Sequence, residues 1–398
     1  GFTAVSGVGY FVNTTGGAIS VNLPAGTAGD VVAIKDYANT FDTYAVTLVQ
    51  NGSDKIGGSA VNAVLSTEGL AVTLVFVDST QGWLVTDNGT QDTAPTAEYV
   101  TATGGTPTTS PCGNYKIHTF TGPGTLCVSN AGNPSGSTTV DYLVVAGGGG
   151  ANGGPGNTAG GAGGGGFRAS SSTYSIGAAP ASPLITSVSA LPVSVQGYTI
   201  TVGGGGAGNT NCGGNNGNPS TFSSITSTYG AKPNFNGGSG GGTPGGALNV
   251  PGGTGNTPPV SPPQGNDGGA SSNPSGPDHA SGGGGGAGAA GTQGRASSPT
   301  QSGPGGIGAG LPNAFGTSGE SSGGFYYFSA GGGAGGNGGI PVTAGTGGIG
   351  GGGDGGSNAG CAGSTNTGGG GGAGGGPAGG SGGSGGSGIV VIRYKFQN

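Results

Sequence analysis

Glycine runs with a period of three residues constrain the fold of this chain more than any other feature. Of its 398 residues, 108 are glycine. The period is clearest at 378–387, where Gly-Gly pairs separate single Ala and Ser residues, and it recurs at 334–340. Three residues per turn is the period of the polyproline II helix, which has no internal hydrogen bonds. A single run of this kind is solvated backbone, so it needs neighbouring runs to become ordered.

Packed runs can satisfy one another's backbone hydrogen-bonding groups. Side by side, each run offers amides and carbonyls to the next, and glycine permits Cα–H···O contacts worth about 0.5–1 kcal/mol each. These bonds offset the entropy that glycine loses on ordering. Collagen requires a strict Gly-X-Y register, which neighbouring glycines and phase breaks exclude. A flexible Gly/Ser linker is disfavoured because the apolar segment 389–394 follows the last run directly. The sequence therefore predicts a bundle of polyglycine II helices.

The remaining apolar residues form short β-type blocks. They are β-branched, lack the 3.6-residue period of a helix and are separated by Gly, Asn, Asp and Thr. We therefore expect an all-β fold with almost no α-helix. The blocks of a first β module, 1–90, lie at 10–12, 19–23, 31–34, 46–49, 72–77 and 83–85.

A polar segment separates this module from the rest. Residues 91–111 are small, polar and interrupted by proline, which predicts a linker. The second domain, 112–398, combines β-structure with glycine runs. Its expected strands lie at 115–120, 138–145, 193–202, 221–229, 325–329 and 389–396.

Charge excludes two classes of partner. Eight basic and fourteen acidic residues give a net charge of −6, and Lys and Arg form no cluster. Neither nucleic acid nor an anionic membrane is expected to bind. No apolar run approaches the roughly 20 residues of a spanning helix, so no membrane insertion is expected. Methionine is absent even at position 1, which predicts that sequence upstream of Gly1 is missing.

The four cysteines, at 112, 127, 212 and 361, lack the close spacing of zinc or redox sites. The cysteines are therefore expected either to form disulfides or to be unreactive thiols. Cys112 and Cys127 bracket a short alternating segment whose ends can meet across a hairpin. A bridge that closes a loop of about 15 residues contributes roughly 3 kcal/mol. We expect the Cys112–Cys127 pair first, and Cys212–Cys361 as a second candidate.

No catalytic, cofactor or metal site is predicted. Matches to GxGxxG within the runs arise by chance, and they lack the strand and helix that flank a nucleotide site. The two histidines, His118 and His279, are too few for a histidine-based triad or metal site, and His118 is expected on a strand surface. Glycosidase chemistry needs paired carboxylates. The acids of the glycine-rich part are isolated, at Asp267, Asp278, Glu320 and Asp354. The chain is therefore not expected to be an enzyme.

The first module resembles the small β modules of bacteriophage tail fibres. The resemblance lies in the segments YFVNT, VNLPA, GDVVAIKD and GWL, at 10–14, 21–25, 29–36 and 82–84. Such modules typically trimerise, so the resemblance implies a homotrimer.

The second domain is similar to the glycine-rich domain of phage tail-tip proteins, over about 138–395. The segments VDYLVVAGGGG, GGFR, YTITVG and SGIVVIRY occur in that order, at 140–150, 165–168, 198–203 and 387–394. Related tail-fibre adhesins fold as a sandwich of polyglycine II helices whose connecting loops touch a bacterial receptor. The resemblance implies a location in the virion tail fibre, other tail-fibre subunits as partners, and adhesion to an outer-membrane protein or surface glycan of a host.

Receptor contacts are expected in loops, because loops on a rigid scaffold carry recognition. The candidates are Tyr229, Phe235, His279 and Phe315, each flanked by Pro, Asn or Gly. The aromatic block 325–328 precedes a glycine run and is expected to be a core strand.

One rival function is a structural subunit of an extracellular or cell-surface filament, which needs self-complementary ends. Another is ice binding, which the irregular loops and the few threonines in the runs disfavour.

Overall fold

The computed structural model describes residues 1–89, 97–154, 159–185, 187–210, 213–246, 249–272, 279–295, 300–336, 342–376 and 380–397. The chain forms two compact units, Gly1–Thr96 and Ala97–Asn398. Within the described residues, helix is limited to α1, Ser182–Ile185, and the 3-10 turn η1, Asn313–Phe315. The prediction of a β fold with almost no α-helix is confirmed.

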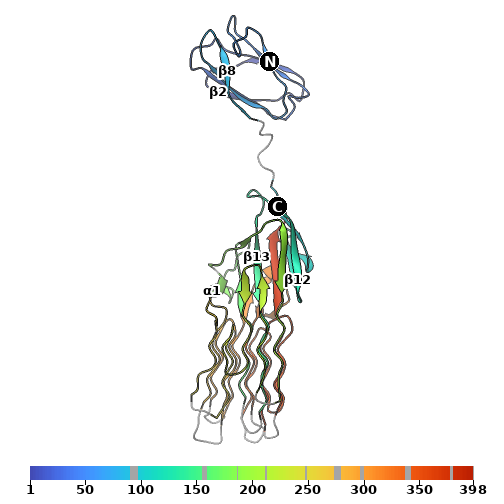
Figure 1. Cartoon of the computed structure of the whole chain (residues 1–398), viewed down its shortest axis with the longest axis vertical. Coiled ribbons are helices and arrows are strands. Elements are labelled where there is room, and N and C mark those ends of the chain that lie inside the picture. The colour runs from blue at the N-terminus through green and yellow to red at the C-terminus, as the bar shows by residue number, and fades with distance from the viewer. Residues whose placement is uncertain are drawn as a thin grey trace. The chain divides into compact units, whose positions relative to one another are not determined.

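The first unit is a sandwich of two four-stranded sheets (Figure 1). One sheet has the order β1-β3-β5-β6 and the other β2-β4-β7-β8. All six predicted blocks lie in strands, whereas the short β1 and β6 were not predicted. The bounds are β1 Phe2–Thr3, β2 Val8–Val12, β3 Ile19–Asn22, β4 Val31–Asp36, β5 Val46–Val49, β6 Ala63–Leu65, β7 Ala71–Phe76 and β8 Trp83–Gly89.

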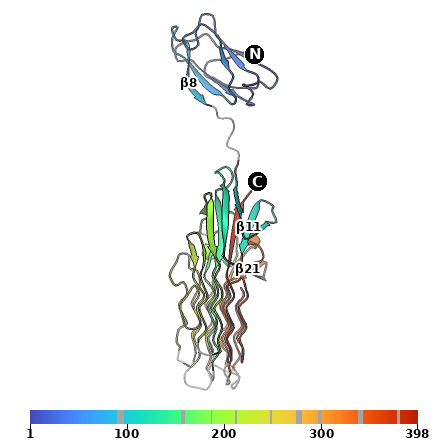
Figure 2. The same cartoon turned by 45° about the vertical axis from the view of Figure 1, so that its right-hand side comes forward.

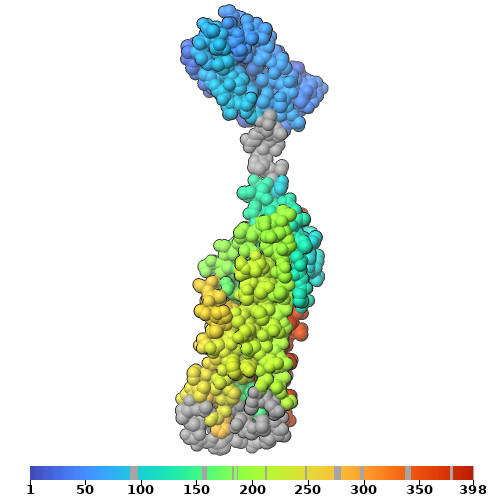
Figure 3. All heavy atoms as spheres, in the orientation of Figure 1, coloured from blue at the N-terminus to red at the C-terminus, as the bar shows by residue number. Residues whose placement is uncertain are grey.

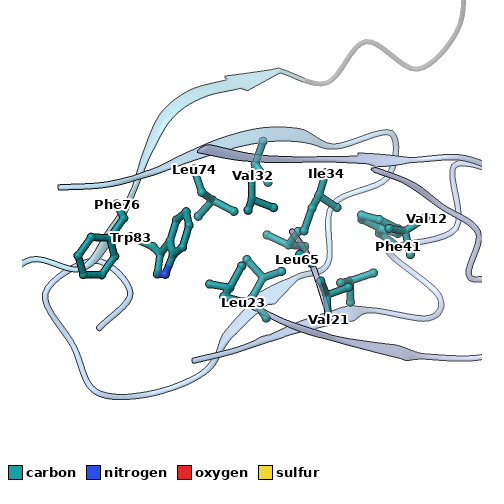
Figure 4. Close-up of a cluster of buried hydrophobic side chains, with 14 residues drawn as sticks. Val12, Val21, Leu23, Val32, Ile34, Phe41, Leu65, Leu74, Phe76 and Trp83 are labelled. Carbon is teal, nitrogen blue, oxygen red and sulfur yellow. The ribbon is translucent and has the colours of Figure 1, made fainter. Parts of the chain in front are cut away.

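Alternating side chains from both sheets fill the space between them (Figure 4). Val32 and Ile34 of β4 are buried, while the alternate residues Val31, Ala33 and Lys35 point outward. Trp83 is fully buried and meets the ring of Phe76 edge-on, with the ring centroids 5.5 Å apart. The period-two pattern that predicted the strands thus also builds their core.

The second unit contains three sheets. The six-stranded sheet has the order β10-β11-β22-β13-β14, with β15 paired to β13. The other orders are β18-β17-β16-β12-β9 and β19-β21-β20. The bounds are β9 Val100–Thr103, β10 Thr106–Thr109, β11 Tyr115–Phe120, β12 Gly124–Ala131, β13 Thr139–Val145, β14 Phe167–Ala169, β15 Leu191–Pro192, β16 Gln196–Thr201, β17 Ser220–Phe222, β18 Ile225–Ser227, β19 Ala309–Leu311, β20 Glu320–Ser322, β21 Phe325–Phe328 and β22 Ile389–Lys395.

The six-stranded sheet is covered on both faces. β13 and β22 pair antiparallel at its centre, with Leu143 opposite Val391. Tyr142 and Val144 pack toward the five-stranded sheet, and Leu143 packs toward the three-stranded sheet and α1. Burial on both faces explains why β13 and β22 are almost continuously apolar.

The prediction of a linker at 91–111 is wrong for residues 97–111. β9 pairs with β12 and β10 pairs with β11, so both belong to the sheets of the second unit. Val100 and Ala102 are buried in its core. β10 is an exposed edge strand, the position in which a sheet tolerates proline such as Pro107. The Thr- and Pro-rich composition of this segment is why the sequence did not predict β9 and β10. Residues 90–96 lie outside the described residues.

Glycine runs extend from the strand ends of the second unit and lie side by side (Figures 1 and 2). Their hydrogen bonds rotate with a period of three. The successive amides from Gly147 to Ala151 donate to the carbonyls of Asn218, Gly386, Gly163, Asn215 and Gly383. Donors three residues apart therefore bond the same neighbour, at acceptors that also differ by three. This is the predicted polyglycine II arrangement.

Interior runs are bonded on all sides. The carbonyls of run 147–151 accept from Gly230, Gly206 and Gly371, which lie on three runs different from those that its amides reach. The run therefore has six hydrogen-bonded neighbours. The same pattern holds for runs 159–166, 280–288, 329–336 and 368–375.

Neighbouring backbones occupy the space that a side chain would need. A Cβ added to Gly148 would lie 2.1 Å from the carbonyl oxygen of Gly369, and one added to Gly150 would lie 2.2 Å from that of Ala207. Real Cβ atoms do not approach carbonyls so closely. Figure 3 shows how tightly the outer runs lie against one another on one face of the unit.

Two glycine substitutions test this packing. In Gly382→Ala, the new Cβ would lie 2.3 Å from the carbonyl oxygen of Ala151, so the free energy of unfolding should fall by about 1–3 kcal/mol or more. Gly204→Ala is the matched control, because the nearest atom to its Cβ, the amide nitrogen of the Asn218 side chain, is 3.7 Å away. It should be neutral or stabilise by about 0.4–1 kcal/mol. Urea unfolding followed by circular dichroism compares them, and equal stabilities would contradict the packing.

Candidate functional site

The glycine runs extend away from the strands of the second unit, and the end of the unit that they approach is here called the far end (Figure 2). The run that leaves β13 after Val145 reaches this level at Asn152. Asn152 forms a bridge with Asn209, and the amide of Gly382 donates to the Asn209 carbonyl. The chain enters the unit at β9 and finishes after β22, both at the strand end. Runs from distant parts of the sequence therefore meet at the far end.

A polar hollow of about 310 Å³ lies at this level. Ser381, which forms a bridge with Ala359, lies one residue from Gly382 and so belongs to the far end. Hydroxyl, side-chain amide and backbone groups line the hollow, so it can donate and accept hydrogen bonds without carrying a charge. The lining residues are Thr210, Asn358, Ala359, Gly380 and Ser381. The sequence gave no sign that Ser381 meets Thr210 and Asn358, which lie on other runs.

Phe235 is presented to solvent, as a receptor contact requires. It lies in the turn 232–236 between two runs, and its side chain is 51% exposed. The ammonium of Lys232 lies 4.2 Å from the centroid of its ring, a contact worth about 0.5–1 kcal/mol at an exposed site. Asn234 has φ of 63°, a left-handed conformation that Asn tolerates. The side-chain oxygen of Asn236 accepts from the amide of Thr254 at 2.7 Å, which anchors the turn.

Tyr229 and His279 are half-buried. Tyr229 lies in the run before the Phe235 turn, and its carbonyl accepts from the amide of Gly238. His279 begins the run 280–288 at the far end, next to the Ser272–Ala280 bridge. The structure brings neither residue to the polar hollow, and their roles as receptor contacts stay predictions.

Phe315 is not a surface loop residue, and this prediction is wrong. It ends the 3-10 turn η1, is 1% exposed and packs in the core beneath the six-stranded sheet. Its ring meets that of Tyr174 edge-on at 5.4 Å. The flanking Pro, Asn and Gly indicated a loop correctly, but local sequence does not show that the turn folds back over the core. Phe328 of the neighbouring aromatic block is buried, as expected for a core strand.

His118 is also buried, contrary to the expected strand surface. Its Nδ1–H donates to the carbonyl of Gly104 at 2.7 Å, and Nε2 lies 3.0 Å from the Tyr394 hydroxyl. Since Nδ1 carries the proton, neutral Nε2 accepts from the hydroxyl. Burial, with a smaller contribution from Lys116, holds the pKa of His118 below its usual value. The histidine joins β11 to β22 as a neutral structural residue.

The predicted Cys112–Cys127 bridge is not formed. Cys112, Cys127 and Cys361 are free, exposed thiols, and Cys212 lies outside the described residues. The hairpin that would have joined the first pair does not exist, because β11 and β12 belong to different sheets. Hydrogen bonding to Ser110, with a smaller effect of Arg393, lowers the pKa of the Cys112 thiol.

The sequence did not predict a buried cluster of charged residues around Asp141 and Arg393. Asp141 on β13 accepts from the hydroxyl of Ser170 at 2.6 Å and from the amide of Thr173 at 2.7 Å. The guanidinium of Arg393 on β22 donates to the Thr173 carbonyl and stacks 3.6 Å from the centroid of the Tyr115 ring. Burial lowers the pKa of Arg393. These contacts tie the segment after β14 to the central sheet, so their role is structural.

Within the described ranges, no three His, Cys, Asp or Glu side chains are grouped so as to hold a metal ion. In the same part of the chain, no helix is long and apolar enough to span a bilayer.

Comparisons with known proteins concern both the domain and its setting. Residues 121–395, more than half of the chain, match the family described as "Glycine-rich domain". A stretch of 77 residues, 19% of the chain, is 36% identical to the baseplate wedge protein gp10 of Enterobacteria phage T4. This stretch spans 13% of the length of that protein.

The buried His118 predicts a pH dependence of stability. Its folded pKa lies below the unfolded value of 6.5, so the unfolded chain takes up a proton first. Stability is complete above about pH 6.5 and falls as the pH drops toward the folded pKa, by no more than about 1.4 kcal/mol per pH unit. Urea midpoints at pH 7.5 and 5.5 should differ less in His118→Gln than in the wild type. An unchanged difference would show that another group titrates.

Proposed function

The chain belongs to the glycine-rich domain family, and we propose that it is a structural and host-adhesive protein of a bacteriophage tail fibre. In this proposal the second unit is a rigid shaft. Its far end binds a bacterial surface receptor, either an outer-membrane protein or a surface glycan, without covalent chemistry. Other tail-fibre subunits are its structural partners, and the first unit assembles as a homotrimer, as its resemblance to tail-fibre modules implies.

The hydrogen-bonded bundle is the observation that carries this proposal. Interior runs bond six neighbours through their backbones, so the runs cannot slide without breaking many bonds together. Such a scaffold holds its connecting segments in place, and exposed segments on rigid scaffolds are where recognition residues concentrate. Both chain ends of the unit lie at the strand end, whereas described residues of separate runs, such as Asn152, Asn209 and Gly382, meet at the far end.

The similarity to a phage baseplate protein supports a virion setting. It covers a small share of both chains, so it supports a structural role in a phage tail more directly than any particular receptor. The family match adds the domain type that the packed runs represent.

The chemistry of the second unit favours hydrogen bonding and stacking over charge. Residues 97–398 contain six acidic and six basic residues, so this part of the chain has no net charge. The polar hollow offers hydroxyl and amide groups, and Phe235 offers an exposed ring with an adjacent cation. Aromatic rings beside hydrogen-bonding groups suit both protein and glycan surfaces.

Adsorption to bacteria tests the far-end hollow and the Phe235 turn. We expect Phe235→Ala, and Asn358→Trp, which fills the hollow, each to reduce binding of the labelled full chain to a susceptible strain by about tenfold or more. Ile307→Ala is the matched control, because Ile307 is an exposed apolar side chain of the same unit, 42% exposed, that lines neither feature. The control should bind as the wild type does, and all three variants should keep the wild-type Tm.

Treatment of the cells separates the receptor classes. Loss of adsorption after protease treatment indicates a protein receptor, and loss after periodate oxidation indicates a glycan. Wild-type adsorption by both the Phe235 and the Asn358 variants would contradict the adhesive role of these two features. A chain that adsorbs to no strain of a broad panel and forms continuous head-to-tail polymers in electron micrographs would instead support the filament function.

A further inference from the structure

The two sheets of the first unit have different outer faces. In the β1-β3-β5-β6 sheet, the outward positions of strands β3, β5 and β6 mix polar and apolar residues, namely Ser20, Asn22, Thr47, Val49 and Val64. In the β2-β4-β7-β8 sheet, the outward positions are mostly apolar, although the core lies on the opposite side. They are Gly9, Phe11, Val31, Ala33, Lys35, Ala71, Thr73, Val75, Leu84, Asp87 and Gly89. This second surface is called the Phe11 face.

The unit as a whole exposes more large apolar side chains than the glycine-rich unit does. Among the described residues, ten of the fourteen exposed large hydrophobic side chains belong to residues 1–89. A monomer usually exposes such residues singly, and a continuous exposed patch marks an interaction site. The Phe11 face is the sheet surface on which apolar outward positions adjoin across neighbouring strands.

Shape on the Phe11 face is self-complementary. The ring of Phe11 is 76% exposed, so it projects from β2 as a knob. Beside it lies a hollow of about 170 Å³, whose lining includes the small residues Gly9, Ala33 and Ala71 together with Phe11 itself and Lys35. A cavity of roughly 150 Å³ accepts a benzene ring, so the hollow has room for a phenyl group. A second copy of this unit carries both the knob and the matching hollow.

The distribution of charge also favours a second copy of the unit as the partner of the Phe11 face. Residues 1–96 contain eight acidic and two basic residues and thus the whole net charge of the chain, −6. Like charge opposes contact between two copies over most of the unit. The Phe11 face carries one charge of each sign, because Lys35 lies near the end of β4 and Asp87 lies opposite Thr73 on the edge strand β8. The face therefore has no net charge, and repulsion between two copies is smaller here than over the rest of the unit.

We propose that the Phe11 face is the self-association surface of this protein, on which the Phe11 ring of one copy enters the hollow of another. A two-fold pair exchanges the rings mutually, and a three-fold ring passes each ring to the next copy. The inference rests on the assembly part of the function proposed above and is independent of host contact. It names the surface that holds copies together and the side chain that inserts into the neighbouring copy.

The mass of the full chain in solution tests the proposal. Wild-type protein should sediment as a dimer or trimer of the 36.4 kDa chain. Phe11→Asp places an acid in the hollow of its neighbour and should weaken association by about 30-fold or more, the size of effect seen for central interface residues. Ala33→Leu, which fills the hollow and leaves Phe11 intact, should also weaken association. Val64→Asp is the matched control, because Val64 is 59% exposed and lies on a strand of the other sheet.

The single tryptophan, Trp83, reports whether the variants fold. It is fully buried in the core of the same unit, so native emission shows that this core is intact. A monomeric wild type at about 100 µM, or a Phe11→Asp variant with native emission and wild-type mass, would overturn the proposal. Dissociation by Val64→Asp alone would assign the contact to the other sheet and would equally overturn it. A monomer that still adsorbs to bacteria would refute this inference and leave the host-contact function standing.

Discussion

Backbone hydrogen bonds between glycine runs are the interaction on which the second unit depends. A polyproline II-type helix satisfies none of its own amides, so each run is ordered only by its neighbours. Gly147 and Gly148 show the consequence, since their amides donate to two different runs and their carbonyls accept from two others. Because backbones approach closely, most interior positions have no space for a side chain. The high glycine content follows from this geometry and not from flexibility.

The β-sheets give the runs their starting positions. β13 and β22 form the centre of a sheet buried on both faces, and glycine runs adjoin both strands. At this junction the hydroxyl of Ser220 donates to the Val145 carbonyl, and that of Ser227 donates to the Val144 carbonyl. Strand pairing thus sets the lateral order and register of the first glycines, and the period of three carries that register along the runs. A hydrophobic core and a backbone-bonded bundle form one continuous structure.

The surfaces assigned to function are those that the packing leaves unfilled. Phe235 stands out from a short turn because neighbouring backbones anchor that turn and no core lies above it. Thr210 and Ser381 meet in a hollow because separate runs end at one level. In the first unit, Phe11 is exposed because small residues beside it leave a hollow. Contact with a host and contact between copies are thereby proposed for different units.

Local sequence alone determined the class of fold. Alternation in blocks such as Val31–Asp36 predicted strands, and the Gly-Gly-X period predicted packed polyglycine II helices, because both patterns are properties of neighbouring residues. Contacts between distant segments were decided only by the tertiary structure. The sequence suggested that His118 and Phe315 are exposed, but both are buried. Tyr394 of β22 packs against His118, and η1 folds back so that Phe315 enters the core. The far-end hollow was likewise invisible, because its residues become neighbours only when runs bond in register.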